Sequence, residues 1–120
     1  MPWDGTELWV ADILADGALS TPERIAGGEA VSVFQPTWSP DSRLFYVADP
    51  DGWWSLYACE PGQEPSCVHG GEREFGRPQW VFGMQTFGFV GADSGRVLAT
   101  YCEQGDWCVG WVDSRTGALS

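Results

Sequence analysis

Short apolar runs separated by turn-forming residues follow one another along the whole chain. Alternating apolar and polar positions predict strands, because successive side chains of a strand point to opposite faces of a sheet. No segment repeats apolar residues at the spacing of an amphipathic helix, so we expect little helix. The predicted strands are Glu7–Ile13, Arg24–Ile25, Thr37–Ser39, Leu44–Ala48, Ser55–Cys59, Cys67–His69, Thr86–Val90, Val97–Cys102 and Trp107–Asp113.

The segments between these strands contain residues that favour the tight turns of β-hairpins. Asp49-Pro50-Asp51-Gly52, Asp93-Ser94-Gly95 and Gln104-Gly105-Asp106 are examples. Asp and Gly are favoured in tight turns because they tolerate positive φ angles or bond locally to the backbone. We therefore expect neighbouring strands to pair as antiparallel hairpins.

The chain also repeats itself. Arg43, Gly52, Trp54 and Leu56 correspond at one constant offset to Arg96, Gly105, Trp107 and Val109, and Gly17-Ala18-Leu19-Ser20 recurs as Gly117-Ala118-Leu119-Ser120. A period of about 50 residues built of four short strands is typical of β-propeller blades. Such a sheet cannot bury both faces alone and has to stack on a neighbour.

The sequence thus predicts an all-β chain of about two four-stranded blades of a β-propeller, incomplete at both ends. Residues 1–30 are expected to end one blade, residues 31–74 to form a complete blade, and residues 75–120 to form most of a further blade. All-β folds of this kind usually need about 200 to 250 residues, which is more than this chain has. The alternative is a compact β-sandwich whose hairpins resemble one another by chance.

Four segments resemble one known family. They are Pro2–Val10 (PWDGTELWV), Phe34–Val47 (FQPTWSPDSRLFYV), Asp51–Tyr57 (DGWWSLY) and Phe75–Gly83 (FGRPQWVFG). Taken in this order they are similar to propeller segments of the peptidase S9 family, which includes prolyl oligopeptidase and the dipeptidyl and acylaminoacyl peptidases. Ser42 stands where that family usually has glycine. The resemblance covers nearly the whole chain.

This resemblance implies a propeller, usually of about seven or eight blades, that caps an α/β-hydrolase domain and screens substrates by size. Nothing in the chain corresponds to the hydrolase domain with its Ser, Asp and His triad. We therefore expect a non-catalytic fragment of the gating domain, which is not an enzyme by itself. The alternative function is a free-standing binding module that self-associates to complete its sheets, as a homo-oligomer joined through open blade edges.

Catalytic chemistry has few candidates. The nucleophile of an α/β-hydrolase requires a G-x-S-x-G turn, and the sequence contains none. The sole histidine, His69, lies beside two glycines in a predicted outer strand. We expect no catalytic residue, no metal ligand and no cofactor.

Four cysteines are the remaining reactive groups: Cys59, Cys67, Cys102 and Cys108. Each local pair brackets a turn, so two disulfides within hairpins are candidates. Their spacing differs from the C-x2-C knuckles of zinc sites. Free, buried thiols fit the sequence equally well. Free thiols would indicate a cytoplasmic protein, and bridged ones a periplasmic or extracellular protein.

The chain contains eight tryptophans, whose large apolar side chains are expected to supply much of the core. The predicted blade-packing core is Trp9, Trp38, Trp54, Leu56, Trp107, Val109 and Trp111. Another three tryptophans near turns, Trp3, Trp53 and Trp80, are candidates for an exposed aromatic surface that contacts a peptide or a sugar.

Charge and hydropathy limit the partners. The 17 acidic and 6 basic residues give a net charge of −11, which repels phosphate backbones, so no nucleic acid is expected. No apolar run approaches the roughly 18 residues of a membrane span, so no membrane association is expected. A peptide is one candidate partner, and the sequence does not identify the ligand.

Overall fold

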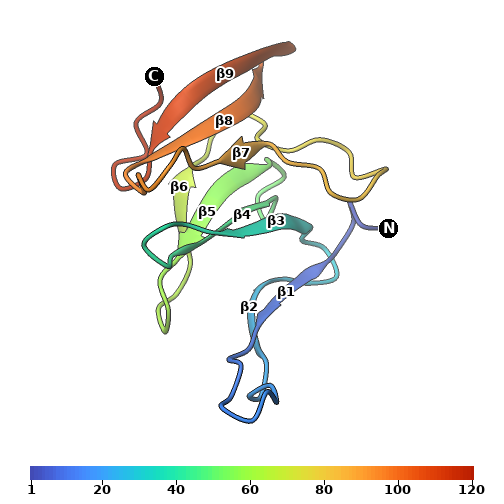
Figure 1. Cartoon of the computed structure of the whole chain (residues 1–120). Helices are drawn as coiled ribbons and strands as arrows, with labels where there is room; N and C mark the ends of the chain where they lie inside the picture. The colour runs from blue at the N-terminus through green and yellow to red at the C-terminus, as the bar shows by residue number, and fades with distance from the viewer.

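The computed structural model describes residues 1–120 and consists of three antiparallel sheets stacked along the chain (Figure 1). Strands β1 (Glu7–Val10) and β2 (Glu23–Gly27) form the first sheet. Four strands form the middle sheet in sequence order: β3 (Val33–Trp38), β4 (Leu44–Ala48), β5 (Ser55–Cys59) and β6 (Ser66–His69). The third sheet contains β7 (Phe87–Gly88), β8 (Arg96–Glu103) and β9 (Asp106–Asp113). The predicted all-β architecture of incomplete propeller blades is confirmed.

The predicted strand boundaries differ from the observed ones in seven of the nine strands. Strands β4 and β5 begin and end at the predicted residues. Strand β1 ends at Val10, and Ile13 makes only an isolated bridge to Leu19. Strand β3 begins four residues before the predicted start, because a register shift between Phe34 and Thr37 breaks the alternation on which the prediction depended.

The middle sheet is buried on both faces. Phe45, Val47 and Leu56 on one face are fully buried and pack against the third sheet. Leu44 and Tyr46 on the other face pack against the first sheet. The apolar surface removed from water between sheets is therefore the main source of stability. This arrangement agrees with the expectation that one blade depends on its neighbours.

The two outer sheets each keep one face open. Trp9 on β1 is 51% exposed, and Trp107 and Val109 on β9 are 48% and 68% exposed. No sheet of this chain covers these faces, so the packing of these three residues between blades stays a prediction. Trp38 is likewise exposed, in a groove beside the first sheet.

Other members of the predicted core are enclosed. Leu56 has no exposed surface. Trp54 packs against the middle of the molecule, with its ring 5.3 Å from the Phe34 ring in an edge-to-face arrangement. Trp111 is half-buried beneath the Arg96 guanidinium, which lies 4.9 Å from its ring centre. The structure contains no helix long and apolar enough to span a membrane.

Polar side chains join the middle and third sheets at two further points. Arg43 donates hydrogen bonds to the Ser94 carbonyl at 3.1 Å and to the Ser114 hydroxyl at 2.9 Å. The His69 Nδ1 lies 2.7 Å from the Gly117 carbonyl oxygen. These contacts fix how the two sheets lie against each other, because hydrogen bonds are directional in a way that apolar packing is not.

Candidate functional site

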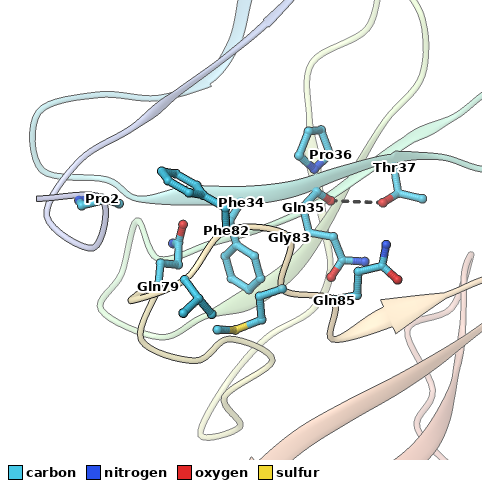
Figure 2. A pocket seen from close by; sticks show the side chains of 11 residues that line it. Pro2, Phe34, Gln35, Pro36, Thr37, Gln79, Phe82, Gly83 and Gln85 are labelled. Carbon is cyan, nitrogen blue, oxygen red and sulfur yellow. Dashed lines mark hydrogen bonds between the residues drawn. The ribbon is translucent and has the colours of Figure 1, made fainter.

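A hollow of about 350 Å³ lies where strand β3 meets the long loop between β6 and β7 (Figure 2). Its lining combines apolar and amide side chains and contains no charged residue. The lining residues are Pro2, Phe34, Gln35, Pro36, Thr37, Gln79, Val81, Phe82, Gly83, Met84 and Gln85. We call this site the uncharged hollow.

Gln35 holds one wall of the uncharged hollow in place. Its φ of 53° lies in the left-handed region, which is uncommon for a residue other than glycine. Its side-chain oxygen accepts a hydrogen bond from the Thr86 N–H at 2.6 Å, and its amide nitrogen donates to the Phe87 carbonyl at 2.7 Å. These bonds tie β3 to β7 across two sheets and help offset the local strain.

The opposite wall is an exposed apolar loop. Val81 and Phe82 line the hollow and are 67% and 102% exposed, and the adjacent Trp80 is 78% exposed. Trp80 belongs to the predicted aromatic surface, whereas Val81 and Phe82 were not predicted to contribute to a site. The available signal was a run of three large apolar residues bounded by Pro78 and Gly83 and lying outside every predicted strand. A cluster of exposed apolar residues of this kind often marks an interaction site.

The predicted aromatic surface is only partly brought together. Trp3 and Trp80 line a second hollow of about 450 Å³, together with Trp54 and Trp107. The Arg77 guanidinium lies 4.1 Å from the centre of the Trp107 ring, a cation–π contact. Trp53 is exposed elsewhere and does not line this hollow.

His69 has a packing role. Its ring meets Phe75 edge to face at 5.4 Å, and its Nε2 lies 3.4 Å from an Arg73 guanidinium nitrogen. With Nδ1 held at the Gly117 carbonyl, both ring nitrogens contact other groups of the protein. No three His, Cys, Asp or Glu side chains converge in a way that could hold a metal ion.

All four cysteines are unbridged in the structure. On the β8–β9 hairpin, Cys102 lies opposite Trp107 and Cys108 lies opposite Tyr101. Neighbouring residues of a strand point to opposite faces, so these two thiols project to different sides of the sheet. The expectation that this hairpin brings them within disulfide reach is therefore wrong.

The other candidate pair is also unbonded. Cys67 lies opposite Tyr57, two positions before Cys59 on the same strand. Burial raises the pKa of both thiols, and nearby carboxylates, Glu64 beside Cys59 and Asp51 beside Cys67, add to this effect. Both cysteines are thus held in the protonated, weakly nucleophilic form.

No family model and no curated protein matches the chain. Among solved structures, a puromycin-hydrolyzing peptidase from Mycobacterium tuberculosis is 33% identical with a TM-score of 0.85, and the match covers 99% of this chain and 18% of that one. A puromycin hydrolase is 32% identical with a TM-score of 0.86, over the same shares of the two chains.

A third structure, a serine-to-alanine mutant of puromycin hydrolase complexed with PGG, is 32% identical with a TM-score of 0.87. It too is matched over 99% of this chain and 18% of its own. The chain thus spans less than one fifth of the length of the structures it matches. Nearly every residue of the chain takes part in these matches, and the matched region is propeller-like. The chain belongs to the peptidase S9 family, of the prolyl-oligopeptidase type, as a partial β-propeller domain.

Proposed function

We propose that the chain is a non-catalytic part of the β-propeller of an S9 serine peptidase, where it serves as scaffold and substrate screen. The observation that supports this most directly is the near-complete match of the chain to 18% of each puromycin-hydrolyzing relative. On this proposal, the nucleophile and its general base lie in a domain outside the matched part.

The chain's own residues are consistent with this role. Its sequence lacks the G-x-S-x-G turn that exposes the serine of an α/β-hydrolase. The imidazole of His69 contacts the Gly117 carbonyl and Arg73 and makes no hydrogen bond to a serine. A general base has to lie within hydrogen-bonding distance of the proton it removes.

The purified chain is expected to hydrolyse neither aminoacyl nor peptidyl reporter substrates, because it supplies no paired nucleophile and base. A fluorophosphonate probe, which labels activated serines covalently, should leave the chain unlabelled, with an unrelated serine hydrolase as positive control. Turnover that co-purifies with the chain and disappears on substitution of one serine would overturn the proposal.

We propose self-association of a free-standing binding module as the second candidate function. The open faces of the outer sheets favour it. Trp9 lies on one such face, and Trp107 and Val109 lie on the other. Exposed apolar sheet faces of this kind gain stability when a second sheet covers them.

If self-association occurs, light scattering at micromolar concentration should give a mass above that of the monomer. Val109→Glu should then return the chain to a monomer, because it places a charge in the middle of the contact. Leu14→Glu, at an exposed loop position away from β9, is the matched control and should leave the mass unchanged. A monomeric wild-type chain under these conditions would contradict this candidate.

A further inference from the structure

We propose that the uncharged hollow binds an apolar, uncharged side chain of an extended peptide segment. This inference deepens the proposed function and rests on it, because it gives the substrate-screening propeller a contact point for peptide. The hollow opens between β3 and the Trp80–Phe82 loop, and Figure 2 shows the aromatic and amide side chains converging on it from both sides.

The apolar part of the hollow suits a single large side chain. Phe34 is buried against Trp54 and supplies a rigid floor. Phe82 is fully exposed and has no packing partner that holds it away from a ligand. Met84 adds a flexible thioether side chain, which adapts to ligands of different shape. A volume of about 350 Å³ lies at the lower end of the range of small-ligand sites.

The amide groups suit a peptide backbone. The Gln79 side chain donates to the Ser32 hydroxyl at 3.1 Å through its nitrogen, and this leaves its carbonyl oxygen free to accept. The Gln85 side chain makes no hydrogen bond within the chain and offers both a donor and an acceptor. Gln35, by contrast, is already satisfied by Thr86 and Phe87 and fixes the wall. A peptide bond presents one N–H and one C=O, which these free groups can pair.

The absence of charge argues for a neutral ligand. The chain carries 17 acidic and 6 basic residues, and none of them lines this hollow. A charged side chain placed here would lose water without gaining a partner of opposite charge, which is unfavourable. A lysine or glutamate side chain should therefore bind less well than phenylalanine.

The test is an NMR titration of the ¹⁵N-labelled chain with three blocked tripeptides, which carry no terminal charges. These are acetyl-Ala-Phe-Ala-amide and the same peptide with Lys or Glu in the centre. We expect the Phe peptide to shift the backbone signals of residues 33–37 and 79–85. Its affinity should exceed that of both charged peptides by about tenfold or more, as expected for one large apolar contact.

Phe82→Asp is the diagnostic variant, because Phe82 is fully exposed and lies outside every strand, so its replacement should leave the fold intact. Its affinity for the Phe peptide should fall by about tenfold or more. Leu14→Asp, which places the same charge at an exposed loop position that does not line the hollow, is the matched control and should bind as the wild type does.

The proposal is overturned if the Phe peptide does not bind, if it binds wild type and Phe82→Asp equally, or if the three peptides bind alike. It is also overturned if the loop signals shift with protein concentration alone and Phe82→Asp abolishes that shift, because a second copy of the chain then occupies the hollow. A failed titration leaves the proposed scaffold function untouched. Labelling by the fluorophosphonate probe, in turn, overturns that function and leaves the peptide site standing.

Discussion

Phe45→Ala is expected to lower the free energy of unfolding by about 3 to 5 kcal/mol, the usual cost of removing a buried phenylalanine ring. Phe45 has no exposed surface and lies on the middle sheet, facing the third sheet. Its ring meets Phe89 edge to face at 5.0 Å, and the Arg43 guanidinium lies 5.2 Å from its centre. The substitution therefore opens a cavity at the contact between two sheets.

Urea denaturation followed by tryptophan fluorescence measures this change. Phe45→Leu is the matched control, because it keeps most of the apolar volume and should cost much less, on the order of 1 to 2 kcal/mol. Equal losses for Ala and Leu would indicate that the ring contacts rather than the filled volume stabilise the sheet contact. No loss for Ala would contradict the packing of the middle sheet against the third.

Arg43→Ala is expected to cost about 2 kcal/mol, since hydrogen bonds to a charged group contribute about 1.5 to 3 kcal/mol. The Arg43 side chain is 14% exposed. It donates to two carbonyls and one hydroxyl, from Ser94 and Ser114, so its loss removes three hydrogen bonds across the sheet contact. Thermal unfolding in parallel with urea denaturation measures the effect.

Arg96→Ala is the matched control for Arg43→Ala. Arg96 occupies the equivalent repeat position on the third sheet, but its side chain is 60% exposed and its nearest carboxylate oxygen, on Asp93, is 3.7 Å away. Surface changes of this kind stay within about 0.5 kcal/mol. If both substitutions cost the same, the inter-sheet hydrogen bonds of Arg43 contribute no more than an exposed side chain does.

The strands could be predicted from the sequence because they depend on local patterns. The β4 strand is continuous in apolar residues because both of its faces are buried, and β5 follows after a turn rich in Asp and Gly. The repeat of Arg43 and Leu56 at Arg96 and Val109 predicts similar sheets that stack on one another. The alternation of apolar and polar residues and the period of the sequence repeat are sufficient to predict strands and stacked sheets.

Features that depend on contacts between residues far apart in the sequence could not be predicted. The bulge at Gln35 is set by bonds to Thr86 and Phe87, some fifty residues away, which local alternation cannot register. Cys102 and Cys108 project to opposite faces of the sheet because of the β8–β9 register. A shift of that register by one residue would place both side chains on the same face. The exposure of Trp107 depends on whether another sheet covers its face, which the local pattern of residues does not indicate.

The contacts of Arg43 give the stack of sheets a polarity. Arg43 reaches forward into the loops of the third sheet, and Arg96 stands in the same place one repeat later, on the open face beside Trp111. The end of the stack that carries Arg96 thus presents a hydrogen-bond donor. Two copies of that end cannot pair with each other in the way that Arg43 pairs with Ser94 and Ser114. Contacts made in this manner are head-to-tail, so they propagate in one direction until the rotation between successive units closes a ring.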